Sequence, residues 1–331
     1  MKVAVVILNW NGKDLLKQFL PSVIQFSTEA TIYVADNAST DDSIEFLRNN
    51  YPEVKIIQNK ENGGYAKGYN DALKHLSEEI LILLNSDIEV TKNWLEPILD
   101  IFSKDSKTAV AQPKILDYKK KDHFEYAGAA GGFIDKFGYP YCRGRIFDSV
   151  EKDYGQFNDN AEIFWASGAC LAIRNKVFEQ IGGFDEDFFA HQEEIDLCWR
   201  IKNFGYNIKY AGNSIVYHVG GATLNKMDPK KTYYNFRNSL FMLVKNLPKK
   251  KMRKIVLQRM VLDGAAGLKF LFQGDFSHFT AVLKAHAHFY SNFSKMNKKR
   301  SEKSSNIQYF EIKSVVFKYF ILHKTTYKNI I

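Results

Sequence analysis

An apolar run that ends abruptly in polar residues constrains this chain more than any other stretch. Residues 80–84 read ILILL and lead directly into Asn85, Ser86 and Asp87. An apolar run without polar alternation is typical of a strand that is buried on both faces, as in parallel sheets. Ligands of such sheets bind beyond the carboxyl ends of the strands, where a carboxylate can hold a hard cation together with phosphate oxygens. A simple turn is the alternative, because all three polar residues favour turns.

Similar strands alternate with helical patterns in the first third of the chain. Strands are predicted at 3–8, 31–35, 54–58, 81–84 and 109–112, and helices near 13–20, 41–47, 65–76 and 94–102, with Pro21 interrupting the first helix and Thr40 or Asp41 capping the second. This order predicts an α/β fold with a mostly parallel, Rossmann-like sheet and helices on both faces. The polar residues after each strand should then share one edge of the sheet.

No glycine-rich phosphate motif accompanies these strands. The chain has neither G-x-G-x-x-G after its first strand nor G-x-x-x-x-G-K-[ST] anywhere. Specific support for a dinucleotide-binding or P-loop protein is therefore absent. Asp and Asn residues stand at the strand ends instead, which indicates a site organised by a metal ion.

The second half of the chain is less regular. We expect a substrate-side insertion at 116–159 with a mobile loop at 127–138, strand–bend–strand at 163–173, a short helix at 175–181, a helix opening within 188–200, and short strands at 208–211 and 214–218. From residue 233 the pattern is helical and basic, followed by a polar linker at 296–306 and a short helix or strand at 315–322. Connecting segments of this kind often carry substrate contacts.

Charge and cysteine content limit the partners without choosing one. The formal net charge is +9, with basic clusters at 245–259 and 298–300. This suits phosphorylated ligands, nucleic acid or an anionic membrane surface. The three cysteines lack Cys-x-x-Cys spacing, which argues against a disulfide framework or structural zinc and favours a reducing cytosol. No apolar run reaches the roughly 18 residues of a membrane-spanning helix, so any membrane contact would be peripheral.

Seven blocks, in order, resemble glycosyltransferase family 2, whose members invert anomeric configuration on a GT-A fold. They are VILNWNG, VADNASTDDS, NGGYAKGYN, LLNSDIEV, ASGACLAIR, GGFDEDFFAHQEEIDLCWR and SIVYHVGGATL. Within the family the chain looks most like bacterial rhamnosyltransferase-like enzymes of polysaccharide assembly. The resemblance implies a GT-A domain at 1–230, with a nucleotide-sugar-binding half to about residue 112 and an acceptor-binding and catalytic half after it. A basic, mainly helical region follows at 231–331.

The resemblance also assigns donor-binding roles. Asp87 would bind the Mg²⁺ or Mn²⁺ ion that bridges the donor diphosphate, with His218 as a second ligand. Asn85 stands where the family usually has Asp, so we expect metal affinity to be modest or to depend on the diphosphate. Asp36 would hold a uracil or thymine base, although helix capping is an alternative for Asp36 and a structural histidine for His218. Further donor contacts are expected from Asn9, Asn37, Gly63, Gly64, Tyr65, Asn70, Asn85 and Ser86.

Glu194 matches the catalytic base of the family. In a single displacement at the anomeric carbon, one carboxylate accepts the proton of the acceptor hydroxyl. Glu193 and Asp196 compete for this role, although Asp196 and Arg200 form an i,i+4 pair that suits a structural role. Helix dipoles also favour acids in a first turn. Acceptor contacts are expected from Trp165, Gly168, His191 and Glu193.

The predicted function is transfer of a sugar from a dTDP- or UDP-sugar to a hydroxyl of a glycan or lipid-linked saccharide in the cytoplasm. The basic C-terminal region would contact an anionic membrane, or else form a solvated or oligomeric appendix. A nucleotidyltransferase is an alternative, but it would need a glycine- and basic-rich activating loop near the first strand, which this chain lacks. A non-catalytic nucleotide-sugar-binding component is another, which Asp87 and Glu194 disfavour. Net charge without a recognition motif does not predict nucleic-acid binding.

Overall fold

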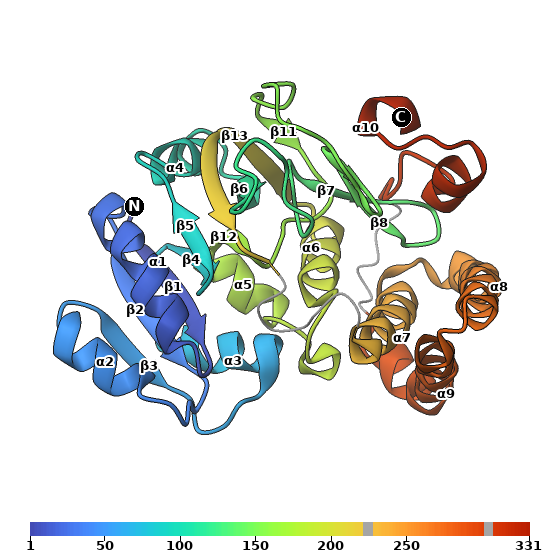
Figure 1. Ribbon diagram of the computed structural model, residues 1–331, viewed down its shortest axis with the longest axis horizontal. Helices are drawn as coiled ribbons and strands as arrows, with labels where there is room; N and C mark the ends of the chain where they lie inside the picture. The colour runs from blue at the N-terminus through green and yellow to red at the C-terminus, as the bar shows by residue number, and fades with distance from the viewer. Residues whose placement is uncertain (221–227, 301–306) are drawn as a thin grey trace.

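The computed structural model describes residues 1–220, 228–300 and 307–331. In this part of the chain a nine-stranded sheet lies between helices, with a four-stranded antiparallel sheet and a group of helices beside it (Figure 1). The elements up to the first long strand are β1 (Val3–Asn9), α1 (Lys13–Phe26), β2 (Thr31–Asp36), α2 (Ser43–Asn50), β3 (Lys55–Gln58), α3 (Gly64–Leu73), β4 (Ile80–Asn85), β5 (Ile88–Val90), α4 (Leu95–Lys104) and β6 (Thr108–Asp117).

The next elements are mostly short strands and turns, and they end with the long strand β13. They are β7 (Gly132–Ile134), β8 (Pro140–Cys142), β9 (Arg145–Ile146), β10 (Ser149–Val150), β11 (Ala161–Glu162), β12 (Cys170–Arg174), α5 (Asn175–Ile181), the 3₁₀ turn η1 (Glu186–Phe188), α6 (Glu193–Asn203) and β13 (Asn207–His218). The C-terminal elements are α7 (Pro229–Asn246), α8 (Lys249–Phe272), α9 (Phe276–Lys298), the π-helical turn η2 (Phe317–Ile321) and α10 (Tyr327–Ile330).

The large sheet has the order β11-β13-β6-β12-β4-β1-β2-β3, with β5 paired to β13. Strands β4, β1, β2 and β3 are mutually parallel. Strand β12 runs antiparallel between β4 and β6, while β13 is parallel to β6. The predicted Rossmann-like, mostly parallel sheet is therefore confirmed, with antiparallel strands inserted at β12, β5 and β11.

Strand residues alternate between two cores because successive side chains point to opposite faces of a sheet. Ile80, Ile82 and Leu84 pack with α1, α2 and α4 in one core. Leu81 and Leu83 pack with α3, α5 and α6 in the other. Burial on both faces explains why β4 reads as an unbroken apolar run.

Several predicted boundaries change. Helix α1 continues through Pro21 to Phe26, and α2 begins at Ser43, because Asp41 Oδ1 accepts from the Ser43 backbone N–H and hydroxyl (3.1 and 2.5 Å). The two predicted strands at 208–218 are one strand, β13, which absorbs the polar interruption as a register shift between Ala211 and Ile215. Residues 163–169 precede β12 without forming the predicted first strand.

The expected mobile loop at 127–138 is instead packed into the core. Ala129, Ala130, Phe133 and Ile134 are buried, and β7 pairs with β8 in the small sheet. Its irregular sequence reflects tight packing: a Cβ on Gly132 would stand 2.0 Å from the Trp165 ring. The segment is therefore a packed part of the core and not a mobile loop.

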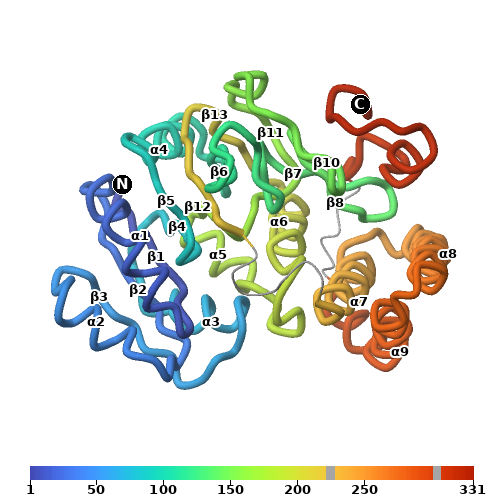
Figure 2. The backbone as a smooth tube through the Cα atoms, viewed as in Figure 1, coloured from blue at the N-terminus to red at the C-terminus, as the bar shows by residue number. Residues whose placement is uncertain are grey.

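The C-terminal region is helical, as predicted. Helices α7, α8 and α9 gather on the side of the molecule opposite α2 and β3 (Figures 1 and 2), and α7 packs against α6. Helix α9 extends to Lys298, so the predicted linker at 296–306 begins as helix, and residues 301–306 lie outside the described residues. The end of the SIVYHVGGATL block, residues 221–224, also lies outside them.

The described helices include none that is both long enough and apolar enough to cross a membrane. The three cysteines are free and buried, as expected for a chain without a disulfide framework.

Candidate active site

The carboxyl ends of β1, β2 and β4 form one polar edge. Asn9 lies opposite Asp36 in the sheet register, and Leu8 lies opposite Asn85. Asn9 Nδ2 donates to Asp36 Oδ1 (3.0 Å), and Asp36 Oδ2 accepts from the Ser39 backbone N–H (2.9 Å). Asn9 Oδ1 is buried without a partner. The predicted strand-end residues thus come together, and Asp36 is held by both a neighbouring strand and its own turn.

Asn37 extends this edge toward α3. Its Nδ2 donates to Gly64 O (3.0 Å) and Asn62 Oδ1 (3.3 Å), and its Oδ1 accepts from Asn59 Nδ2 (2.8 Å). Asn59 also donates to Gly68 O (2.9 Å). Asn37 is buried, so in this structure its amide shapes the wall of the edge.

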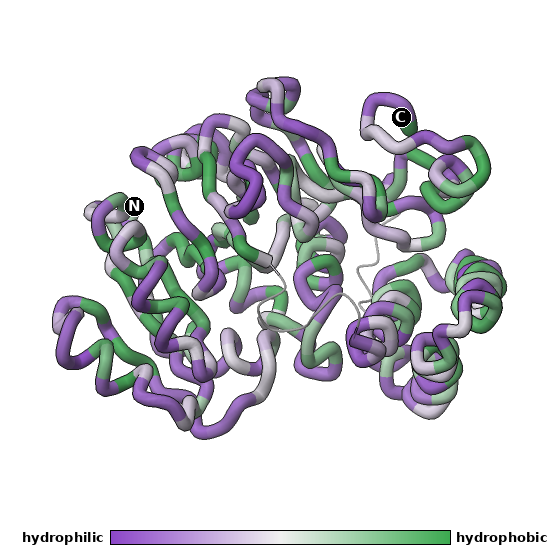
Figure 3. The backbone as a smooth tube through the Cα atoms, viewed as in Figure 1, coloured by the Kyte–Doolittle hydropathy of each residue, from purple (hydrophilic) through white to green (hydrophobic). Residues whose placement is uncertain are grey.

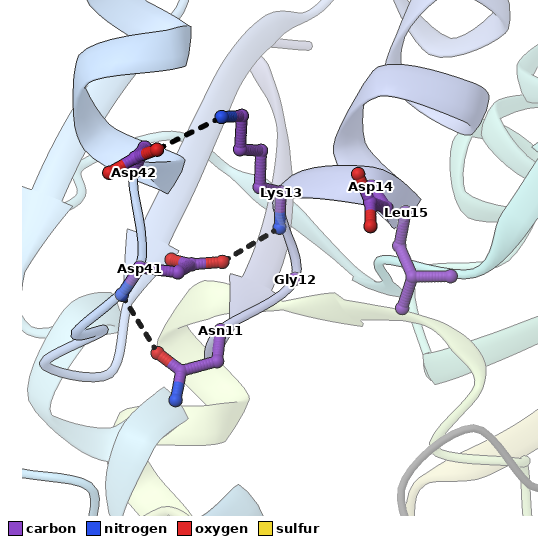
Figure 4. A pocket seen from close by; sticks show the side chains of 7 residues that line it. All are labelled: Asn11, Gly12, Lys13, Asp14, Leu15, Asp41 and Asp42. Atoms are coloured by element: carbon purple, nitrogen blue, oxygen red, sulfur yellow. Dashed lines mark hydrogen bonds and ion pairs between the residues drawn. The ribbon is translucent and has the colours of Figure 1, made fainter.

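A cavity of about 360 Å³ lies beside the edge, between the β1–α1 and β2–α2 loops (Figure 4). Asn11 Oδ1 accepts from the backbone N–H groups of Thr40 (2.7 Å) and Asp41 (3.3 Å), and Lys13 N donates to Asp41 Oδ2 (3.2 Å). These bonds tie the two loops together. The wall residues are Asn11, Gly12, Lys13, Asp14, Leu15, Asp41 and Asp42, none of which was predicted from the sequence as a site residue.

Asp87 and His218 meet although 131 positions separate them. Strand β5 follows Asp87 and pairs antiparallel with β13, so that His218 lies opposite Ile88. Asp87 Oδ1 is 3.2 Å from His218 Nε2, and both side chains are buried. Asn85 Nδ2 lies 3.4 Å from the same ring nitrogen. The two predicted metal ligands are thus brought together with the first residue of the Asn-Ser-Asp triplet.

Glu125 completes this cluster and was missed by sequence reasoning. Its Oε1 is 3.4 Å from His218 Nδ1, and its Oε2 accepts from Ala127 N (2.5 Å). Burial opposes the charge of His218, but Glu125 and Asp87 outweigh it and raise the pKa of His218 to about 10. Burial likewise favours protonated Asp87, but the hydrogen bond and charge of His218 hold the pKa of its carboxyl below the ordinary value.

This arrangement fits a divalent ion. Ligands bound at about 2.1 Å and at right angles stand about 3 Å apart, close to the 3.2 Å between Asp87 Oδ1 and His218 Nε2. Glu125 lies where a carboxylate orients a ligating histidine through its other ring nitrogen. Across the described ranges, no three His, Cys, Asp or Glu side chains are grouped as ion ligands. These two side chains would therefore leave most positions around the ion to ligands other than protein side chains.

A second cluster lies at the start of α6. Burial raises the pKa of Glu194 to about 7, and burial together with Glu194 raises the pKa of Glu193 well above its ordinary value. One oxygen of each carboxylate is buried without a partner, as are His191 Nε2 and Gln192 Oε1. Buried polar atoms are normally paired, so four consecutive unsatisfied side chains indicate a place where a ligand supplies the partners.

Tyr65 and Gly168 connect the two clusters. Tyr65 OH donates to Gly168 O (2.8 Å), and Asn85 N donates to Ala169 O (2.9 Å). Burial, then Tyr69, then the charges of Glu193 and Glu194 raise the pKa of Tyr65, which puts its hydroxyl in the field of both carboxylates. The acidic pair and the strand-end edge therefore both lie near Gly168 and Ala169.

Glycine is required where α3 begins. Gly64 has φ +74°, and a Cβ there would stand 2.7 Å from Phe189 O, to which Tyr65 N donates (3.2 Å). Gly63 precedes it, and Ser86 lies near Gly12 on the opposite loop. Close backbone approach at such a position needs a residue without a side chain.

Two expected site residues use their side chains for packing or for backbone contacts. Trp165 is 2% exposed, donates from Nε1 to Phe133 O (2.9 Å) and packs on Gly132, so neither ring face is open to a sugar. Asn70 holds both backbone groups of Phe184 (2.9 Å each) and so anchors the loop before η1. Asp196 is fully buried and pairs with Arg200 (2.8 Å) and with Lys245 (2.7 Å), which agrees with the structural role considered for it.

The loop before the acidic pair is strained and held from the C-terminal region. Phe189, His191 and Gln192 all have φ between 63° and 70°, a conformation that costs about 1–3 kcal/mol per non-glycine residue. Asn238 of α7 is fully buried, and the two N–H groups of its Nδ2 are shared among three carbonyl oxygens, those of Phe188 (3.0 Å), Ala190 (2.9 Å) and His191 (2.7 Å). These hydrogen bonds hold the backbone of the loop that precedes Glu193 and Glu194.

Asn238→Ala is expected to lower kcat by roughly 10–100-fold with a much smaller change in donor KM, because small misplacements of catalytic groups cost about this much. Steady-state kinetics against the donor measures both constants. Ser239→Ala is the matched control, since Ser239 is equally buried but its hydroxyl bonds only to Asn235 O of its own helix. Equal kcat in the two variants would contradict a positioning role.

The fold and the site together agree with one class of enzyme. A mostly parallel sheet carries a carboxylate–histidine pair at its carboxyl edge and an acidic pair near it, as the GT-A resemblance of the sequence implies. The model of the family described as "Glycosyl transferase family 2" matches residues 4–182, more than half of the chain. The protein belongs to glycosyltransferase family 2 and is a glycosyltransferase.

Curated relatives agree with this family. The chain is 26% identical over 234 residues to N-acetylglucosaminyl-diphospho-decaprenol L-rhamnosyltransferase from Mycobacterium tuberculosis, covering 65% of this chain and 75% of the relative. It is 25% identical over 211 residues to the low-salt glycan biosynthesis hexosyltransferase Agl10 of Haloferax volcanii, covering 62% and 63% of the two chains.

Solved structures share the fold. TarS residues 1–349 of S. aureus in complex with UDP-GlcNAc superpose with a TM-score of 0.57 at 15% identity, covering 90% of this chain and 91% of that one. GalNAc-T7 with UDP, GalNAc and Mn²⁺ gives 0.54 at 19% identity, covering 66% and 43%. The mannosyltransferase PcManGT of Pyrobaculum calidifontis, with GDP-Man and Mn²⁺, gives 0.53 at 13% identity, covering 87% of each chain.

Proposed function

We propose that the protein transfers a sugar from a dTDP- or UDP-sugar to a hydroxyl of a glycan or lipid-linked saccharide, with inversion at the anomeric carbon. The observation that carries this proposal is the pair of buried carboxylates with unsatisfied oxygens, Glu193 and Glu194, beside the strand-end edge. A lipid-linked acceptor is supported by the name of the mycobacterial relative. Family membership leaves the nucleotidyltransferase alternative without support.

In this proposal Glu194 accepts the proton of the acceptor hydroxyl while the hydroxyl oxygen bonds to the anomeric carbon. The bond from that carbon to the donor phosphate oxygen breaks on the opposite face, and the nucleoside diphosphate leaves with the bonding electrons. A pKa near 7 gives a base that is substantially ionised at neutral pH. Asn9, Asp36 and the loop that contains Asn37 hold the base and ribose of the donor.

Asp87 and His218 would hold Mg²⁺ or Mn²⁺, and Glu125 would orient the ring of His218. When bound, the ion would neutralise charge that develops on the departing diphosphate. Two of the structural neighbours are complexes that contain Mn²⁺, which supports a divalent ion here. Asn85 contributes no charge, so we infer that the nucleotide is needed for tight metal binding.

A panel of nucleoside-diphosphate sugars tests the function. The protein with Mn²⁺ is incubated with each donor and a mixture of lipid-linked and free saccharides, and nucleoside-diphosphate release is measured. We expect acceptor-dependent release from at least one dTDP- or UDP-sugar, abolished by a chelator. Undiminished release in the chelator would contradict the metal site, and acceptor-independent release alone would contradict transfer.

A further inference from the structure

Helix α8 carries a second apolar stripe that faces away from the protein. Its buried side is made by Met252, Ile255, Val256, Arg259, Asp263 and Gly267. On the opposite side the exposed apolar residues are Leu257 (65% exposed), Val261 (67%), Leu268 (50%) and Phe272 (84%). These four follow one another at helical spacing, so they form a continuous stripe along one face. Isolated exposed apolar residues are ordinary on proteins, but a stripe of four is not.

The same outward face begins with basic residues. Lys250 and Lys254 precede Leu257 at helical spacing and are exposed, as is Arg253 beside them. The one acidic residue of α8 is Asp263, which is buried and bonded to Arg259 (2.7 Å). The outward face of α8 is therefore basic at its first turns and mainly apolar along the rest, with exposed Lys269 near its end.

The apolar surface continues onto neighbouring elements. Phe276 at the start of α9 is 65% exposed. Lys269 Nζ stands 4.8 Å from the centre of the Phe320 ring, which brings the end of α8 beside η2, where Phe320 and Ile321 are exposed. Figure 3 shows α8 at the outer edge of the molecule with hydrophobic turns along it. The stripe is thus the centre of a broader surface that other elements of the described chain leave open.

We propose that this outward face of α8, with Lys250, Lys254, Leu257, Val261, Leu268 and Phe272, docks the protein on an anionic lipid bilayer. A helix with basic residues and an apolar face binds in the plane of the interface, with its apolar side among the upper acyl chains. Anionic headgroups attract the lysines, whose long stems let the charge stay at headgroup level. A bilayer offers negative charge and an apolar layer in one surface, which matches both halves of the stripe.

Docking here is separate from the catalytic proposal and would concentrate the enzyme where lipid-linked acceptors lie. Helix α8 contributes no residue to the edge or to the acidic pair. Helix α7, to which α8 is joined through residues 247 and 248, is the helix that clasps the catalytic loop through Asn238. The membrane-facing helix and the loop that carries the candidate base are therefore linked through one intervening helix.

Vesicle co-sedimentation tests the docking surface. The full chain is mixed with vesicles of phosphatidylcholine alone or of phosphatidylcholine with phosphatidylglycerol, at low and high salt. We expect binding to the anionic vesicles that is weakened by salt, and little binding to the neutral ones. The double variant Leu268→Glu/Phe272→Glu should lose about tenfold or more in affinity, and Lys250→Glu/Lys254→Glu should lose a similar factor and most of the salt dependence.

The controls separate docking from folding and from catalysis. Tyr154→Glu introduces the same charge at an 81% exposed aromatic residue outside the helical region and should bind vesicles as the unchanged protein does. Nucleoside-diphosphate release in detergent solution should be unchanged in all variants. Equal vesicle binding by the stripe variants and the Tyr154 control would overturn the proposal. So would a concentration-dependent dimer, seen by sedimentation velocity without lipid and abolished by the stripe variants, because it would assign the surface to self-association.

Discussion

Glu194→Gln is expected to lower sugar-transfer turnover by about 10²–10⁴-fold, the usual contribution of a positioned general base. Donor affinity should change little, because the amide keeps the shape of the carboxylate and the donor edge is untouched. Turnover is measured by nucleoside-diphosphate release, and donor binding by calorimetry. Glu193→Gln is the matched control, an isosteric change one residue away that removes the competing carboxylate. If Glu193→Gln abolished turnover and Glu194→Gln did not, the base would be Glu193.

The pKa of Glu194 adds an independent readout. Since its proton must be absent for catalysis, kcat/KM should rise with pH through about 7 and then level off, and this inflection should vanish in Glu194→Gln.

The raised pKa of Glu194 also affects the stability of the folded state. A carboxyl whose folded pKa is raised above 4.5 to about 7 makes the folded state progressively less stable as pH rises across that interval. Glu194→Gln should therefore be more stable to urea at neutral pH while being less active.

Asp87→Ala is expected to lower kcat/KM by about 10³-fold or more, because a bound ion contributes several kcal/mol of charge stabilisation. Mn²⁺ affinity in the presence of the nucleoside diphosphate, followed by the spin resonance of free Mn²⁺, should fall in parallel. Glu89→Gln is the control, since Glu89 lies two residues on and its carboxylate pairs with Lys121 near the surface (2.5 Å). Equal Mn²⁺ affinity in these two variants would exclude Asp87 as a ligand.

The strand-end edge could be predicted from local pattern. Buried apolar strands that end in Asn9, Asp36 and Asn85 imply a parallel sheet, and parallel strands present their carboxyl ends together. The register of β1 with β2 and β4 then brings these residues side by side. No knowledge of distant contacts was needed for this part.

The features that could not be predicted from the sequence depend on contacts between residues far apart in the chain. Glu125 sits in an irregular segment, and nothing near it in sequence indicates that β13 will carry His218 to within 3.4 Å of it. Asn238 lies in a helix that looked like an appendix, yet its amide holds the loop before the base. Trp165 looked like a sugar-stacking residue, but Gly132 leaves room beneath its ring for the small sheet. The division of the chain at residue 230 remains a proposal, because one apolar core runs across it.

The configuration of the product tests the central claim most directly, namely that a single displacement assisted by Glu194 transfers the sugar. The anomeric centre of the product is assigned from its one-bond carbon–proton coupling by NMR and compared with that of the donor. The proposal predicts opposite configurations in donor and product, formed by the unchanged protein and only at trace level by Glu194→Gln. A product with the donor's configuration, or equal yield from Glu194→Gln, would contradict it.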